Sequence, residues 1–254
     1  RFGKSIAANM LSAYYTCEYD SRELFSNLKI ASSDSYEKHL NKYDVIFLNM
    51  QEFLSQSSNV EEMLSLLKKS VIWDLLDKYP DFRYFDETNL MRTLQDIYNQ
   101  QTGCPFVIII DEWDCIFREY ITDKKAQEKY LDFLRDLLKD KGYVALAYMT
   151  GILPIKKYGS HSALNMFDEF SMTNPGALAE YVGFTENEVL RLSKEYNINF
   201  EEAKHWYDGY LLSNQHIYNP KAVVSVMTRK NFRSYWSQTG SYEAVVPLIN
   251  MDFD

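Results

Sequence analysis

The segment that most limits how this chain can fold is an apolar run that ends in a group of acids. Residues 106–110 are five consecutive apolar residues, and Asp111, Glu112 and Asp114 follow almost at once. A run of this length, rich in β-branched side chains and preceded by a glycine and a proline, is typical of a strand buried on both faces in a parallel sheet. Open α/β sheets bind ligands at the carboxyl ends of their strands, where these carboxylates would lie. The alternative interpretation is a strand that ends in a solvated acidic turn.

The first residues, RFGKS, match the second half of a phosphate-binding loop. In such a loop the backbone N–H groups of a tight turn and of a helix N-terminus surround the phosphates, and a lysine reaches the β and γ oxygens. Gly3 can supply the turn, Lys4 the charge and Ser5 the hydroxyl that binds Mg²⁺. Apolar residues recur at helical spacing behind the loop, at Ile6, Met10, Ala13 and Tyr14. The alternative is a surface turn that caps a helix.

Together the two motifs predict a P-loop NTPase whose first strand and start of the loop precede Arg1, so we expect the chain to be a fragment. We expect Asp111 to hold Mg²⁺ through water, together with Ser5. Glu112 would act as the general base that polarises the attacking water.

A second apolar strand is predicted at residues 143–148, and it leads to Thr150 and a glycine. In NTPases that place an extra strand between the phosphate loop and the acidic strand, that strand ends in a small polar residue that reads the γ-phosphate. Thr150 is the candidate for this role. The alternative is a threonine that only ends a strand.

Four stretches are shared with a known family: RFGKS, IIIDEWD, TGILPIKKYGSHSALNMFDEFSM, and WYDGY followed by YNPKAVVSVM. By these stretches the chain resembles the bacterial predicted AAA-ATPase-like family along almost its whole length. Members often carry a C-terminal nuclease-like domain. The resemblance implies an ATP-binding domain of the additional-strand type, related to signal-transduction ATPases. It assigns nucleotide binding to Gly3, Lys4 and Ser5, and Mg²⁺ and catalytic roles to Asp111 and Glu112.

Helix and strand patterns alternate in the first part of the chain, which predicts a mainly parallel, doubly wound α/β sheet. A strand is expected at 45–48 and helices near 60–69 and 90–99, with FDEFS at 167–171 as a weaker candidate for a last core strand. We therefore predict an additional-strand P-loop NTPase core over residues 1–178.

Helix start signals dominate the rest of the chain. N-caps are expected at Thr185, Asn199 and Asn219, the first as a capping box with Glu188 and the last with proline at the first helical position. They predict a helical lobe over residues 179–254, of the kind that closes over the nucleotide in P-loop ATPases. Gly209 in WYDGY is expected to end a helix in the left-handed conformation.

Composition narrows the possible partners. A net charge of −9 argues against a broad nucleic-acid surface, and the small cluster at Lys156 and Lys157 is more typical of solvated lysines. No apolar run approaches the roughly 18 residues that span a bilayer and no signal peptide is recognisable, so a cytoplasmic protein is expected. The three cysteines favour buried free thiols, and the four histidines lack metal-ligand spacing, so Mg²⁺ is the only metal indicated.

The function favoured by the sequence is Mg²⁺-dependent ATP binding and hydrolysis that drives a switch. The alternative is an interaction module that regulates an attached nuclease-like effector. Such a module could be gated by nucleotide or independent of it. Glu112 favours hydrolysis because a pure binder would not need it, and a phosphotransferase would need an acceptor pocket that the sequence does not reveal. No arginine finger is predicted, because solvated helix surfaces are expected for Arg118, Arg191, Arg229 and Arg233.

Overall fold

The structure is a computed structural model that describes residues 3–101, 103–154, 164–171, 174–212 and 215–235. The chain divides into two compact units, of which one is Ser5–Phe167 and the other combines Arg1–Lys4 with Asp168–Asp254. The predicted domain boundary after residue 178 stays a prediction, and the cluster at Lys156 and Lys157 lies outside the described residues.

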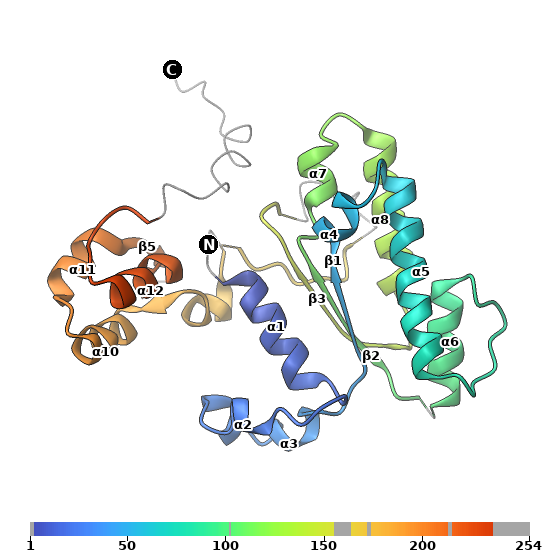
Figure 1. The fold of residues 1–254 in the computed structure, drawn as a ribbon, viewed down its shortest axis with the longest axis horizontal. Coiled ribbons are helices and arrows are strands. Elements are labelled where there is room, and N and C mark those ends of the chain that lie inside the picture. Colours follow the sequence, from blue (N-terminus) through green and yellow to red (C-terminus); the bar gives the residue numbers. More distant parts are fainter. Residues whose placement is uncertain (1–2, 102, 155–163, 172–173, 213–214, 236–254) are drawn as a thin grey trace. The chain divides into compact units, whose positions relative to one another are not determined.

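The first unit is built on a three-stranded parallel sheet (Figure 1). Its strands, in spatial order, are β1 (Val45–Asn49), β2 (Phe106–Asp111) and β3 (Val144–Thr150). All six residues of β2 are buried, as expected for a central strand with apolar side chains on both faces. The three strands predicted in this region are therefore confirmed.

Most of the remaining residues of this unit form helices. They are α1 (Lys4–Tyr15), α2 (Arg22–Phe25), η1 (Lys29–Ser32), α3 (Tyr36–His39), α4 (Met50–Ser55), α5 (Val60–Lys78), α6 (Leu90–Gln100), α7 (Cys115–Glu119) and α8 (Lys124–Leu138). Side-chain N-caps begin four of them, at Asn49, Asn59, Asn89 and Asp123. The predicted helices near 60–69 and 90–99 are confirmed as parts of α5 and α6.

Helix α1 covers one face of the sheet, where Ala8 is fully buried with Val107 and Ile109 of β2. The residue that follows α1, Thr16, forms a β-bridge with Tyr43, just before β1 begins. The C-terminal end of α1 therefore lies near the start of the strands. Because Ala8 packs over the middle of β2, the N-terminal end of α1 points toward the carboxyl ends of the strands (Figure 1).

The opposite face of the sheet is covered by the larger hydrophobic core. Phe106, Ile108 and Ile110 point to this side, where they join buried residues of α5, α6 and α8. In Figure 1 these helices lie on the side of the sheet away from α1. Helices on both faces of a parallel sheet give a mixed α/β fold.

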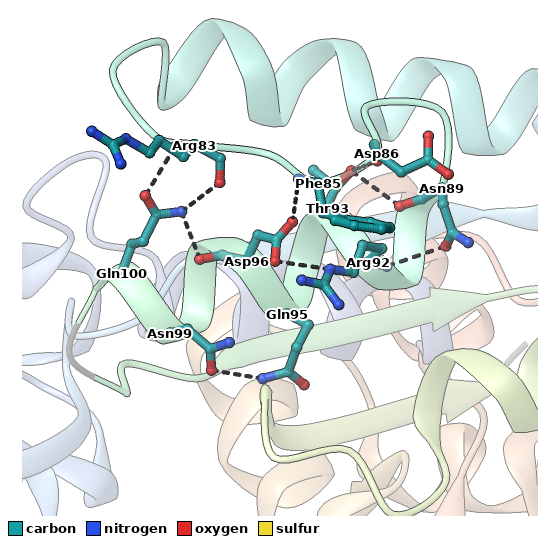
Figure 2. A network of polar contacts seen from close by, with 10 residues as sticks. All are labelled: Arg83, Phe85, Asp86, Asn89, Arg92, Thr93, Gln95, Asp96, Asn99 and Gln100. Carbon is teal, nitrogen blue, oxygen red and sulfur yellow. Dashed lines mark hydrogen bonds and ion pairs between the residues drawn. The ribbon is translucent and has the colours of Figure 1, made fainter.

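The loop between α5 and α6 is fastened to α6 by a polar network (Figure 2). Asp96 accepts hydrogen bonds from the backbone N–H of Phe85 at 2.8 Å and from Nε of Arg92 at 3.0 Å, and the Arg92 guanidinium lies 4.6 Å from the centre of the Phe85 ring. The side-chain amide of Gln100 exchanges two 2.9 Å hydrogen bonds with the backbone of Arg83. These contacts give the loop a fixed path, along which Phe82 and Tyr84 pack against the core.

A buried acid, Asp44, ties the amino-terminal end of β1 to the ends of α5 and α6. Lys78 Nζ lies 2.6 Å from Oδ1, Tyr79 donates a hydrogen bond to Oδ2, and Gln101 Nε2 donates to Oδ2 at 3.2 Å. Burial alone would raise the pKa of Asp44, but the hydrogen bonds from Lys78, Tyr79 and Gln101 outweigh it and lower that pKa.

Asp44→Asn is expected to reduce the free energy of unfolding by about 1–3 kcal/mol at neutral pH, because it weakens a buried charge-assisted network. Since the folded-state pKa lies below the ordinary value, the stabilisation is present above about pH 4 and is lost as the pH falls through the folded pKa. Urea denaturation should show that the difference in the free energy of unfolding between Asp44→Asn and the unmodified protein shrinks from neutral to acidic pH. Asp34→Asn, which replaces an exposed acid, is the control. A difference that stays constant into the acid range would contradict this assignment.

The second unit contains the three predicted capped helices and also a small antiparallel sheet, which the prediction of a helical lobe did not include. Its strands, in the spatial order β4-β6-β5, are β4 (Phe184–Thr185), β6 (Gln215–Tyr218) and β5 (Asp208–Leu212). Its helices are η2 (Gly176–Tyr181), α10 (Glu186–Tyr196), α11 (Phe200–Tyr207) and α12 (Pro220–Arg229). The N-caps at Thr185, Asn199 and Asn219 are confirmed, the first as a complete capping box.

Three further predictions need correction. Gly209 does not end a helix, because α11 stops at Tyr207 and Gly209 lies inside β5. The FDEFS segment forms no strand, since its two acids interrupt the apolar pattern. Of the cysteines, only Cys115 is buried, which raises its pKa to about 12, whereas Cys104 is half-buried and Cys17 is exposed.

Candidate functional site

Three polar residues form a row at the carboxyl ends of the parallel strands. In the sheet register Asp111 lies opposite Asn49 on one side and Thr150 on the other. Side chains alternate along a strand, so Asp111 lies on the same face as Ile109, and Thr150 on the same face as Tyr148. Both apolar neighbours pack on the α1 side of the sheet. The sheet therefore brings Asp111 and Thr150 together, as their positions at strand ends predicted.

The beginning of α1 reaches the same edge of the sheet. The helix has 12 residues and so rises ~18 Å, close to the ~20 Å length of the six-residue β2. Ser5, in the first turn, is exposed, and Gly3 before the helix has φ 82°, a left-handed conformation that glycine adopts without steric cost. Unsatisfied N–H groups and a partial positive charge at a helix start favour an anion.

Glu112 has an unusual backbone conformation at the end of β2. Its φ of 54° lies in the left-handed region, where residues other than glycine, Asn and Asp are uncommon. The turn holds this conformation through hydrogen bonds: Glu112 N–H donates to Asp111 Oδ1 at 2.9 Å, and Trp113 N–H donates to the Thr150 carbonyl at 3.1 Å. Such strained residues cluster at functional sites.

An arginine from α7 joins the acidic strand end. Arg118 Nη2 lies 2.6 Å from Glu112 Oε2, and its Nε lies 3.6 Å from Asp114 Oδ2. The same Nη2 donates to Gln51 Oε1 of α4 at 3.3 Å. Only 20% of the Arg118 side chain is exposed, so the prediction that it is a solvated surface arginine is wrong. The i,i+4 spacing from Asp114 on a short helix was the available signal.

Asp114 connects the end of β2 to the chain that follows β3. It is fully buried, and its Oδ2 accepts hydrogen bonds from the backbone N–H groups of Ile152 at 2.9 Å and Leu153 at 2.8 Å. The approach is close: a Cβ at Gly151 would lie 2.6 Å from Asp114 Oδ1 and from a ring carbon of Trp113. Asp114 thus fixes the backbone on the carboxyl side of Thr150.

Buried polar atoms without hydrogen bonds gather at this edge of the sheet. Within the described residues no hydrogen bond reaches Thr150 Oγ1, Asp114 Oδ1 or Arg118 Nε. Buried polar atoms are nearly always satisfied by protein, water or a ligand, so these atoms indicate a place for polar atoms that are not part of the chain. Tyr148 lies nearby, and burial, then the charge of Asp111, raises its pKa.

A second cluster of possible metal ligands lies in the other unit. Ligand atoms of Glu186, Asp208 and His216 lie within 4.8 Å of one another, although the sequence spacing of His216 did not suggest this. Each acid already has a polar partner, because His216 Nδ1 lies 2.8 Å from Asp208 Oδ2 and Lys204 Nζ lies 3.0 Å from Glu186 Oε1. The cluster is therefore explained by contacts among its own side chains and those of Lys204.

The chain is similar to known proteins. The chain is 27% identical over 149 residues to a protein of Azotobacter chroococcum mcd 1 described as an uncharacterized protein in the vnfD 5' region. That match covers 56% of this chain and 28% of the relative, so the chain spans less than a third of that protein's length. In the described part of the chain, no helix has the length and apolar character that crossing a membrane requires. Residues 1–160 match the family described as Predicted AAA-ATPase, and the chain belongs to this family.

Proposed function

We propose that this chain is the nucleotide-binding part of a P-loop ATPase of the additional-strand type, which binds ATP with Mg²⁺ and hydrolyses it. One observation carries the proposal. Asp111 and Thr150 lie side by side at the carboxyl edge of the sheet, on the face covered by α1, whose first turn carries Ser5 toward that edge. Membership of the predicted AAA-ATPase family makes ATP the expected nucleotide.

The donor set suits Mg²⁺, which prefers hard oxygen ligands and keeps several of its waters. Asp111 and Ser5 would hold the ion, the carboxylate through water and the hydroxyl directly. When bound, the ion would neutralise charge on the β and γ oxygens. Lys4, where α1 begins, would add a positive charge on the same oxygens, and Gly3 would allow the backbone to turn around the phosphates.

Glu112 and Thr150 would serve the γ-phosphate end of the nucleotide. A carboxylate beside the metal site can orient and polarise a water molecule for attack on phosphorus. The Thr150 hydroxyl is buried and has no hydrogen bond to any residue that the structure describes, and it would contact the γ-phosphate or the attacking water. Hydrolysis needs both contacts, whereas simple binding needs neither.

The strand order supports the additional-strand assignment. β3, which ends in Thr150, lies directly beside the acidic strand β2, and no other strand in the described part of the chain pairs with its second edge. The strand that leads into the phosphate loop would occupy that edge, next to the partly exposed Leu146 of β3. In this arrangement β3 would be the extra strand, between the loop strand and β2.

A role in controlling an effector is the second candidate. The match to the Azotobacter relative covers 28% of that protein, which leaves room there for other domains. In such a protein the nucleotide state of this part would regulate an attached domain, for example a nuclease-like one. Nucleotide binding without phosphate release would favour this candidate over hydrolysis.

Lys4→Ala is expected to weaken Mg²⁺-ATP binding by about 10- to 100-fold, because it removes a charged hydrogen bond of about 1.5–3 kcal/mol to the phosphates. Isothermal titration with Mg²⁺-ATP measures the effect, on protein that retains any native flanking sequence. Lys125→Ala, which removes an exposed lysine of α8, is the matched control. Equal affinity in Lys4→Ala and the unmodified protein would refute the phosphate loop. Release of inorganic phosphate without an added acceptor would exclude a strict phosphotransferase.

A further inference from the structure

The candidate general base is held by a side chain from outside the acidic strand. The guanidinium of Arg118 contacts Glu112 through Nη2 and Oε2 at 2.6 Å. Among the described residues, no hydrogen bond engages the other carboxylate oxygen, Oε1, and 27% of the Glu112 side chain is exposed. One oxygen is thus held by the arginine, and about a quarter of the side chain is open to solvent.

Arg118 is itself held in place by two further contacts. Gln51, near the start of α4, accepts a hydrogen bond from Nη2 at 3.3 Å, and the fully buried Asp114 lies 3.6 Å from Nε. Gln51 in turn donates to Glu119 of α7 at 2.6 Å, so its amide cannot turn freely. The guanidinium therefore links the segments that follow β1 and β2, and its position depends on both.

We propose that Arg118 is a positioning residue for Glu112: it binds one carboxylate oxygen and so directs the other toward the attacking water. This inference rests on the proposed ATP hydrolysis. A catalytic base works best when a third group orients it, and a misplacement of about 1 Å can lower a rate by about 100-fold. The planar guanidinium suits this task because it binds Glu112 and Gln51 in a fixed geometry, which a lysine ammonium would not reproduce.

The pair differs from an ordinary surface ion pair in the same unit. Arg22 and Glu37 are joined by two hydrogen bonds, so both oxygens of that carboxylate are engaged, and both side chains are about half exposed or more. At Glu112 the contact is single, the arginine is mostly buried and the backbone of the acid is in the left-handed conformation. These features suit a contact that orients the Glu112 carboxylate better than a contact that only joins two segments of the chain.

Arg118→Gln is expected to lower kcat for ATP hydrolysis by about 10- to 100-fold, while the Kd for Mg²⁺-ATP stays within about twofold, because binding does not use Glu112. Arg118→Lys should retain only part of the rate. Arg22→Gln breaks the exposed Arg–Glu pair and should leave both kcat and Kd unchanged. Thermal unfolding of each variant tests whether a loss of rate reflects a loss of folded protein.

A double-mutant cycle with Glu112→Gln separates positioning from a structural role. If Arg118 acts through Glu112, then adding Arg118→Gln to Glu112→Gln should change kcat by no more than about twofold. The proposal would be overturned if the losses in kcat of the two single variants multiplied in the double variant. It would also be overturned if Arg118→Gln left kcat unchanged, or raised it and so showed that Arg118 restrains Glu112. Failure of the proposed function looks different: the unmodified protein would release no phosphate, and both proposals would fall together.

Discussion

Glu112→Gln is expected to reduce ATP turnover by about 100- to 10,000-fold while Mg²⁺-ATP still binds, since this is the range that a positioned general base contributes. The amide has nearly the shape of the carboxylate and can still accept the hydrogen bond from Arg118 through its oxygen. It cannot take a proton from water. The loss should therefore appear in kcat, measured by phosphate release, and not in the Kd measured by titration.

Two comparisons make this result specific. Glu128→Gln removes an exposed carboxylate from α8 and should leave turnover unchanged. Asp111→Ala removes the proposed metal ligand, so we expect it to weaken Mg²⁺-dependent binding as well as turnover. If Glu112→Gln kept a rate within about twofold of the unmodified protein, the general-base role would be excluded even if nucleotide binding were intact.

The parallel sheet could be predicted because its information is local. A short uninterrupted apolar run such as 106–110 favours a strand that is buried on both faces, and β2 is such a strand. N-cap chemistry is equally local, so the starts of α10, α11 and α12 were found at the correct residues. The placement of Asp111 beside Thr150 followed from the rule that parallel strands end at one edge.

What the sequence did not reveal depends on contacts between distant residues. β4 pairs Phe184 with Tyr218, and neither two-residue β4 nor the DGYLL sequence of β5 has an alternating pattern long enough to stand out. A helix ending in glycine was therefore the simpler interpretation of WYDGY. Likewise, Arg118 looked like any helical arginine, because its partners Glu112 and Gln51 meet it only after the ends of β1 and β2 are brought together.

The role of Asp114 can be tested through stability, because this fully buried acid joins the end of β2 to the backbone that follows β3. Asp114→Ala should lower the free energy of unfolding by about 3–5 kcal/mol, as expected when one member of a buried charged network is removed and its partners stay buried. It leaves the N–H groups of Ile152 and Leu153 without their acceptor, and Arg118 without its second acid.

Urea denaturation of Asp114→Ala, Asp114→Asn and Asp74→Ala separates the causes. Asp114→Asn keeps one oxygen acceptor and should recover part of the loss, whereas Asp74→Ala removes an exposed acid of α5 and should change stability by no more than about 0.5 kcal/mol. A loss below about 1 kcal/mol in Asp114→Ala would mean that the strand ends are held by other contacts. The expected large loss would show that the backbone after Thr150 is fixed by the acid that also contacts Arg118. In that case one buried carboxylate determines the position of the Thr150 strand end and supports the arginine that holds Glu112.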